Sequence, residues 1–249
     1  MFAAADLRDA LADVARAYRA AGGDSAVLVF GSTGDLATQL ANGAPADVFF
    51  AASASAVDAL AARHRVVGGR RVVYALGRLA LVARCPVPGR IAATRAGGGA
   101  GRDTTRCPTL TLADLGGPQV RTVAVANPAH APYGIAARQA LERSGLWARV
   151  GPKLVLGANI SQAEQFVATG NADAGLIALS LVLRVPGRPY TVVDSTLHEP
   201  LRQTAVVIAG SPRAAGAERF VRYVTGPAGQ RVMRRYGFTL PAAVDAGAR

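Results

Sequence analysis

The chain has 249 residues and 51% of them are hydrophobic, which is enough to bury one large core or two smaller ones. No apolar run approaches the roughly 18 residues of a membrane span, so the sequence predicts a soluble protein. The net charge of +12 comes almost wholly from scattered arginines, without a basic arm or interleaved aromatic residues, so we expect a solvated basic surface and no specific binding of nucleic acid.

The first part of the chain alternates strands with helices. A strand at the N-terminus precedes a helical stripe of apolar residues from Asp6 to about Ala21, and Asp6 stands where an N-cap belongs. Alternation of strands and helices with short loops is typical of a parallel α/β sheet. The elements predicted next are a buried strand at 27–30, a helix at 33–41, a buried strand at 47–51, a helix near 55–62, and strands at 72–74 and 78–84.

Residues 85–110 interrupt this pattern, and we expect a surface excursion there. A glycine run at 97–101 lacks the Gly-Lys-Ser/Thr ending of a phosphate-binding loop, and no strand or helix is predicted beside it. Cys85 and Cys107 flank the excursion. Two alternatives are open for them: a disulfide bond, which would stabilise the loop by about 3 kcal/mol in an oxidising compartment, or two free thiols.

The alternation resumes after the excursion, and no sequence repeat links the two parts of the chain. The chain opens directly in its first strand, so either a secretory leader has been removed or the protein is cytosolic. The remaining predicted elements are strands at 122–126, 153–156, 173–178, 191–194 and 202–209, and helices at 134–144, 161–169, near 213–224 and at 227–236.

Four turns place small or polar residues where a strand leads into a helix. The N–H groups of a helix start are unpaired and carry partial positive charge, so each turn is a potential anion site. Since no cluster of metal ligands accompanies them, the turns together predict a pocket for a small oxyanion. They are Ala4-Ala5-Asp6-Leu7, Gly31-Ser32-Thr33-Gly34, Ala131-Pro132-Tyr133-Gly134 and Ala158-Asn159-Ile160-Ser161.

The sequence gives little sign of catalysis. His64, His130 and His198 lie far apart, each in or beside a loop, which favours exposed loop residues. The segment 31–34 does not meet the Gly-x-Ser-x-Gly pattern of a nucleophile elbow, and the sequence contains no HExxH, CxxC or GxGxxG. We therefore expect no catalytic residues, no metal ligands and no cofactor.

Eight short segments occur in a consistent order between Phe2 and about Leu240: Phe2-Ala-Ala-Ala-Asp-Leu7, Phe30-Gly-Ser-Thr-Gly-Asp-Leu-Ala37, Asn42-Gly-Ala-Pro-Ala-Asp-Val-Phe49, Ala126-Asn-Pro-Ala-His-Ala-Pro-Tyr-Gly134, Gly145-Leu-Trp147, Lys153-Leu-Val-Leu-Gly-Ala-Asn-Ile-Ser-Gln162, Gly170-Asn-Ala-Asp-Ala-Gly175 and Arg235-Tyr-Gly-Phe238. With them the chain resembles the periplasmic molybdate-binding protein family, the solute-binding component of molybdate ABC transporters. The Ala-Pro-Tyr-Gly form resembles one branch of that family.

The resemblance implies an α/β fold of two lobes, the type II periplasmic-binding-protein fold, each lobe a mostly parallel sheet flanked by helices. It implies one lobe at 1–79 with 203–241, a second at 80–202 and a C-terminal tail at 242–249. The ligand would lie in the cleft between the lobes, held by backbone amides and hydroxyls at helix starts rather than by lysine or arginine. The implied contacts are Ala5, Asp6, Thr33 with Ser32 beside it, Tyr133 and Ile160.

Asp6 departs from the family, whose members often carry serine there, and an ionised carboxylate close to a dianion is repulsive. Three arrangements are open. The side chain turns away and caps its helix, which we prefer; or it is protonated, with a raised pKa, and donates to the anion; or it accepts from a protonated oxyanion such as hydrogen phosphate. Some members place a tyrosine where this chain has Ala178, so Tyr133 is a candidate for the aromatic wall instead.

The resemblance implies a monomeric, periplasmic solute-binding protein that captures molybdate, and also tungstate, and delivers it to the membrane permease of an ABC importer. One alternative is a binding protein for another oxyanion, phosphate-like if Asp6 is an acceptor. A second is a cytosolic oxyanion-sensing domain of a regulator, although no helix-turn-helix segment remains for it. A third is an enzyme of similar fold, against which a cleft lined by threonine, tyrosine and backbone argues.

Overall fold

The structure is a computed structural model that describes residues 1–85 and 107–241. A 3-10 turn, η1 (Ala5–Leu7), joins the first strand to the first helix. The strands are β1 (Phe2–Ala4), β2 (Val29–Gly31), β3 (Val48–Ala51), β4 (Val72–Gly77), β5 (Leu79–Ala83), β6 (Val123–Ala126), β7 (Leu154–Gly157), β8 (Ala174–Ala178), β9 (Thr191–Val192) and β10 (Leu201–Val207). The helices are α1 (Arg8–Ala20), α2 (Thr33–Ala41), α3 (Ala54–Ala62), α4 (Pro132–Arg143), α5 (Trp147–Val150), α6 (Ile160–Ala168), α7 (Leu179–Val182), α8 (Ala214–Thr225) and α9 (Pro227–Arg235).

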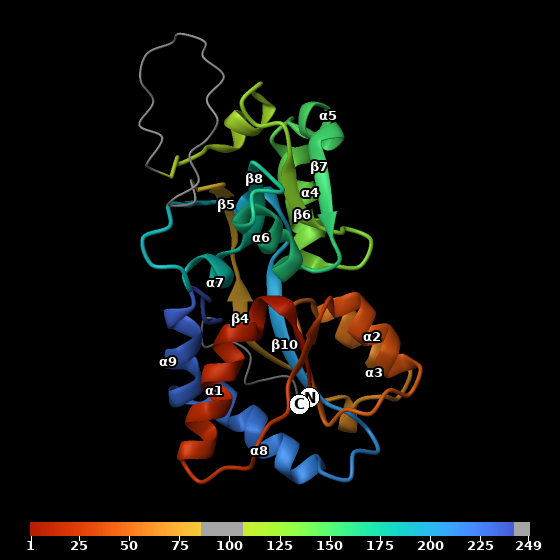
Figure 1. Cartoon of the computed structure of the whole chain (residues 1–249). Helices are drawn as coiled ribbons and strands as arrows, with labels where there is room; N and C mark the ends of the chain where they lie inside the picture. Colours follow the sequence, from red (N-terminus) through yellow and green to blue (C-terminus); the bar gives the residue numbers. More distant parts are fainter. Residues whose placement is uncertain (86–106, 242–249) are drawn as a thin grey trace.

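These elements form two lobes, each built on a five-stranded sheet (Figure 1). Lobe 1 has the strand order β2-β1-β3-β10-β4 and carries α1, α2, α3, α8 and α9, whereas lobe 2 has the order β7-β6-β8-β5-β9 and carries α4 to α7. The chain passes from lobe 1 to lobe 2 between β4 and β5, and it returns to lobe 1 at β10. The predicted two-lobed α/β fold is confirmed.

Both sheets are mixed rather than mostly parallel. In each sheet two strand pairs are parallel and two are antiparallel. The antiparallel pairs involve β4, β5, β9 and β10, which lie next to the two crossings between the lobes. Crossings reverse the chain direction relative to the parallel βαβ units, and so the sequence pattern of those units predicted only part of each sheet.

The strand predicted at 27–30 was wrong in its burial. β2 covers Val29–Gly31 at the edge of its sheet, and Val27, just before it, is 77% exposed. An apolar run with no polar alternation favours a strand that is covered on both faces, but an edge position overrides that pattern. The helix predicted at 33–41 is confirmed as α2, whereas the short helices α5 and α7 were not predicted.

One hydrophobic core runs through both lobes. Its fully buried members include Leu7, Phe50 and Phe220 in lobe 1 and Leu81 and Leu141 in lobe 2. The Phe50 ring contacts the Phe220 ring edge-to-face, with 5.9 Å between the ring centroids. A separate, smaller cluster lies under α2 and α3. Since the main core is continuous across the two sheets, the lobes are in contact in this structure.

Cys85 and Cys107 form a disulfide bond, with 4.6 Å between their Cα atoms. This result selects one of the two alternatives that the sequence left open. The glycine run at 97–101, most of the predicted excursion and the tail at 242–249 lie outside the described residues.

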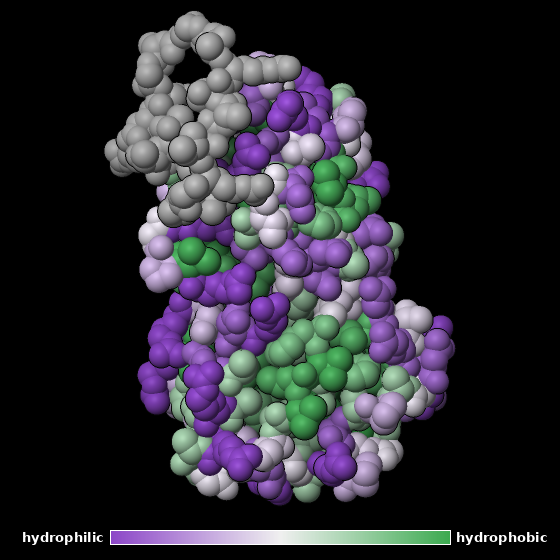
Figure 2. Space-filling view, viewed as in Figure 1, coloured by the Kyte–Doolittle hydropathy of each residue, from purple (hydrophilic) through white to green (hydrophobic). Residues whose placement is uncertain are grey.

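Figure 2 shows hydrophilic residues spread over both lobes, with a hydrophobic area on lobe 1. In the part of the chain that the structure describes, every helix is too short or too polar to cross a bilayer.

The first turn of α4 lies unusually close to the end of β6. A Cβ atom on Gly134 would lie 2.2 Å from the carbonyl oxygen of Ala126, well inside van der Waals contact. Only glycine fits there, because both partners are backbone. This approach fixes the position of Tyr133, the residue before it.

We predict that Gly134→Ala lowers the free energy of unfolding by about 1–3 kcal/mol, because the added methyl group displaces α4 from β6. Urea denaturation followed by circular dichroism measures the change. Gly216→Ala is the matched control: Gly216 is also the third residue of a helix, α8, and its Cβ would meet only side-chain atoms at 3.5 Å. A Gly134→Ala protein as stable as the control would contradict the prediction.

Candidate functional site

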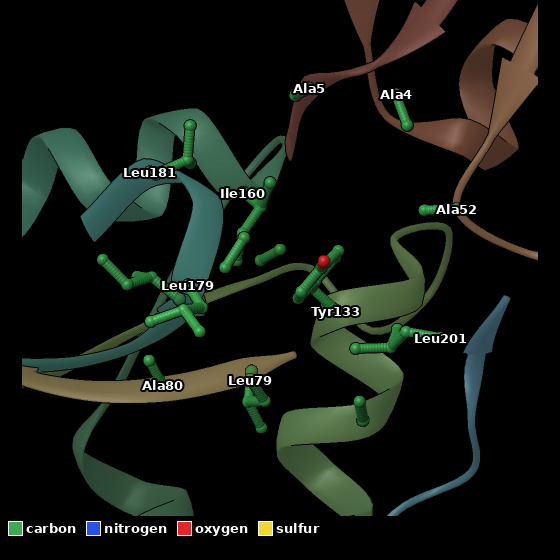
Figure 3. Packing of buried hydrophobic residues seen from close by; sticks show 14 of the residues in the cluster. Ala4, Ala5, Ala52, Leu79, Ala80, Tyr133, Ile160, Leu179, Leu181 and Leu201 are labelled. Carbon is green, nitrogen blue, oxygen red and sulfur yellow. The ribbon is translucent and has the colours of Figure 1, made fainter. Parts of the chain in front are cut away.

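The six residues that the resemblance pointed to lie around one small cavity between the lobes. They are Ala5, Asp6, Ser32 and Thr33 of lobe 1 with Tyr133 and Ile160 of lobe 2, and all six are buried. Ala4, Gly31, Ala52, Ala131, Pro132 and Asn159 complete the lining. Figure 3 shows Tyr133 between α4 and the lobe 1 residues Ala5 and Ala52, with Ile160 nearby. The cavity volume is about 10 Å³, which is room for about one water molecule.

Three helices begin at this cavity, and each leaves a first-turn N–H group without a partner among the described residues. They belong to Thr33 in α2, Tyr133 in α4 and Ile160 in α6. A buried N–H group without an acceptor costs free energy, so these groups call for an acceptor in the cavity. The amides converge from both lobes, as a site for an anion requires.

The neighbouring residues in the sequence explain why these particular amides have no partner. Asn159 is the N-cap of α6, and its Oδ1 accepts from the N–H groups of Ser161 at 3.0 Å and Gln162 at 3.1 Å. The cap uses the next two donors of the helix and leaves that of Ile160. In α4, Pro132 has no N–H group, so Tyr133 presents the first one.

The hydroxyl of Thr33 is prepared to donate. Its Oγ1 accepts from the N–H of Ala52 at 3.1 Å, which leaves the hydroxyl hydrogen for another acceptor. Ser32 is engaged differently, because its Oγ lies 2.8 Å from the carbonyl oxygen of His130 and 2.9 Å from His130 Nδ1. Thr33 is therefore the better hydroxyl donor to a guest.

His130 is the main contact between the lobes on this side of the cavity, which corrects its prediction as an exposed loop residue. Its carbonyl oxygen accepts from the Gly34 N–H at 3.0 Å as well as from Ser32, and its ring lies 3.4 Å from Asp35 Oδ2. The one indication of this contact in the sequence was the glycine at position 34. A Cβ atom there would lie 2.5 Å from the His130 carbonyl oxygen, so the close approach requires glycine. His198 is buried, which corrects the same prediction for that residue.

Two serines of lobe 2 close the other side. Ser161 Oγ donates to the carbonyl oxygen of Ala5 at 3.1 Å, and Ser180 Oγ donates to that of Asp6 at 2.7 Å. With the His130 contacts, these hydrogen bonds hold the lobes closed over the cavity.

The Asp6 side chain does not cap its helix, which corrects our preferred arrangement. Helical structure begins before Asp6, at Ala5, and no side chain caps η1 or α1. Asp6 is 1% exposed, and its Oδ2 accepts from Gln203 Nε2 of β10 at 2.8 Å. The carboxyl group therefore lies in the core, where no sequence signal had placed Gln203 beside it.

Burial raises the pKa of the Asp6 carboxyl from its ordinary value of 3.8 to about 7. Interactions with Tyr133, with the backbone of Asp6 and with Gln203 oppose the rise without cancelling it. None of the residues that line the cavity is lysine or arginine. The site therefore combines dipoles, hydroxyls and a carboxyl of raised pKa, and it can hold a compact acceptor without a counter-charge.

Comparison with known proteins identifies the family of the chain. The family model described as bacterial extracellular solute-binding protein matches residues 1–239. The chain belongs to this family. The fold and the family that the sequence predicted are thereby confirmed. Members of this family bind solutes.

Several relatives to which the chain is similar are molybdate-binding proteins. The molybdate-binding protein ModA of Azotobacter vinelandii is 35% identical over 240 residues, which are 95% of this chain and 88% of that protein. ModA of Rhodobacter capsulatus is 31% identical over 216 residues, which are 87% of this chain and 78% of that protein. Among solved structures, the periplasmic molybdate-binding protein of Azotobacter vinelandii matches with a TM-score of 0.82 and 27% identity, covering 97% of this chain and 98% of that one.

We predict that Gly34→Ala weakens binding of the solute by about tenfold or more, because the added methyl group meets the His130 carbonyl and keeps the lobes apart. The free energy of unfolding should not fall, since alanine favours a helix more than glycine does. Calorimetric titration with molybdate, tungstate, sulfate and phosphate, beside Gly216→Ala, measures the effect. Unchanged affinity for every anion that the control binds would show that the contact does not govern closure.

Proposed function

We propose that this chain captures molybdate between its lobes and delivers it to the membrane permease of an ABC importer. The observation that carries the proposal is the set of unpaired first-turn amides of Thr33, Tyr133 and Ile160 around one cavity between the lobes. The identity to two molybdate-binding proteins above 30% supports the choice of anion. Tungstate, of the same shape and charge, is the second expected solute.

The donor set suits an oxyanion that carries no proton. Every group directed at the cavity by α2, α4 and α6 is a donor, and molybdate offers only acceptors. A charge-assisted hydrogen bond contributes about 1.5–3 kcal/mol, and each helix start adds about 0.3–1 kcal/mol. Several such contacts offset much of the free energy that a dianion loses when it leaves water. The chain acts by reversible binding, without catalysis and without a cofactor.

The remaining elements of the proposal follow from the same role. Ala5, Asp6, Ser32, Thr33, Tyr133 and Ile160 form the binding set, and the lobes 1–79 with 203–241 and 80–202 close on the anion as a monomer. The Cys85–Cys107 disulfide supports a periplasmic location, because such bonds persist in oxidising compartments. Closure creates the shape that a permease recognises.

Calorimetric titration tests the anion directly. We expect molybdate and tungstate to bind one per chain, and sulfate and phosphate to bind at least about a hundredfold more weakly, a difference of roughly 2.7 kcal/mol. Binding of phosphate in preference to molybdate would support the alternative of a phosphate-like solute. The absence of binding by all four anions would contradict the proposal.

Ile160→Pro tests the role of a single amide. Proline is well tolerated at the first position of a helix but has no N–H group, so the variant removes one donor and keeps α6. We expect molybdate affinity to fall by about tenfold to a hundredfold, the loss of one charge-assisted hydrogen bond. Ile160→Val keeps the N–H group and is the control. Equal affinities of the two variants would exclude this amide as a contact.

A further inference from the structure

A buried group of four polar side chains lies beside the cavity, where the two lobes meet. We call it the Asp6 cluster: Asp6 of η1, Tyr74 of β4, Tyr133 of α4 and Gln203 of β10, all buried. β4 and β10 are the strands of lobe 1 at its crossings to lobe 2 (Figure 1). The cluster therefore joins one side chain of lobe 2, that of Tyr133, to three side chains of lobe 1.

The position of Tyr133 in the cluster depends on closure of the lobes. Its hydroxyl oxygen lies 2.2 Å from where a Cβ atom of Gly77 would be, and Gln203 Nε2 lies 3.0 Å from the same point. Gly77 ends β4 just before the crossing, so its missing side chain leaves room for the phenol. Opening the lobes would withdraw Tyr133 and expose the Asp6 carboxyl to water.

Each of the four side chains in the Asp6 cluster has a buried polar atom that lacks a hydrogen-bond partner among the described residues. Asp6 Oδ1, Tyr74 OH, Tyr133 OH and Gln203 Oε1 are all buried without a hydrogen-bond partner of good geometry. Gln203 Nε2 donates the one hydrogen bond of good geometry to the carboxyl, at 2.8 Å, and the Tyr133 hydroxyl and the Asp6 backbone lie close enough to lower its pKa. A carboxylate with so few donors is poorly solvated, whereas a carboxylic acid carries its own hydrogen and needs fewer.

The described surroundings of the carboxyl supply no positive charge, which favours the acid as well. The titratable groups that face Asp6 are the two phenols, Tyr133 from α4 and Tyr74 from β4. Gln203 from β10 and Ser180 from α7 carry no charge. Asp9, one turn along in α1, is the nearest further acid by sequence, and its Oδ2 lies 3.9 Å from Arg184 Nε. Among the described residues, therefore, no cation contacts the Asp6 carboxyl.

We propose that Asp6 is a proton-binding site coupled to the anion site, so that closing the lobes around molybdate takes up a proton at this carboxyl. The proton removes the negative charge that would oppose the dianion. This inference deepens the proposed function and rests on it. It also makes the anion and the proton mutually dependent, because each binds more tightly when the other is present.

The sign of the pH dependence follows from the two states of the carboxyl. Open, it faces water and titrates near its ordinary pKa of 3.8; closed, its pKa is about 7, and the dianion raises it further. The affinity for molybdate is therefore greatest in acid and falls by up to about tenfold per pH unit as pH rises between these two pKa values. It levels off above the pKa of the closed, liganded form.

Calorimetry at about pH 7 in buffers of different ionisation enthalpy counts the protons that accompany molybdate binding. We expect an uptake of about half to one proton per molybdate, because the carboxyl is ionised when open and at least half protonated when closed. In Asp6→Asn the uptake should vanish and the affinity should no longer vary between about pH 6 and about pH 9. Asp24→Asn, which alters an exposed acid of lobe 1, should behave as the wild type.

His130, another titratable group between the lobes, needs its own control. Proton uptake that persists in His130→Gln and disappears in Asp6→Asn supports the proposal. Uptake that follows His130 instead, or wild-type binding without any proton uptake, overturns it and leaves the proposed function intact. A protein that binds no oxyanion at any pH overturns both. The wild-type proton count needs no variant, so misfolding of Asp6→Asn would not prevent the test.

Discussion

The closed structure depends on backbone amides at the lobe boundary that are buried without a hydrogen-bond acceptor in the described part of the chain. Helices α2, α4 and α6 point their first turns at one cavity, and burial removes the water that would satisfy their free amides. The lobes can close at low cost only if something that accepts hydrogen bonds occupies that cavity. Closure and occupancy are therefore the same event in physical terms, which is what a carrier protein requires.

The net charge of +12 plays no direct part in that event. No arginine lines the cavity, so the basic surface acts only at a distance, by raising the rate at which anions arrive. Discrimination is left to the cavity itself. Fixed amides recognise an acceptor whose size and shape match the positions of the donors.

The sequence predicted those parts of the fold that depend on neighbouring residues in the chain, such as the starts of helices. The turns at residues 31–34 and 158–161 predicted helix starts. Helices α2 and α6 do begin there, because Ser32 and Asn159 adopt the extended backbone conformation of an N-cap. The same reasoning failed for β2, where exposure depends on which strand lies at the edge of the sheet. Edge position is a property of the topology rather than of the residues.

The site was predicted incompletely for a similar reason. The resemblance named residues around the cavity but not their partners: Gln203 comes from a strand almost two hundred residues after Asp6, and His130 meets Ser32 across the boundary between the lobes. For Asp6, an N-cap is the local preference, yet the side chain enters the core because η1 starts one residue earlier. Gly34 and Gly77 were the available clues, since each leaves space for a group from the opposite lobe.

Diffraction from crystals grown with molybdate, recorded at the molybdenum absorption edge, would test the central claim most directly. The account predicts a strong anomalous peak in the cavity, with the amide nitrogens of Thr33, Tyr133 and Ile160 within hydrogen-bond distance of the oxyanion and no arginine among its contacts. A peak confined to surface arginines, or an anion held in the cavity by a guanidinium group, would contradict it.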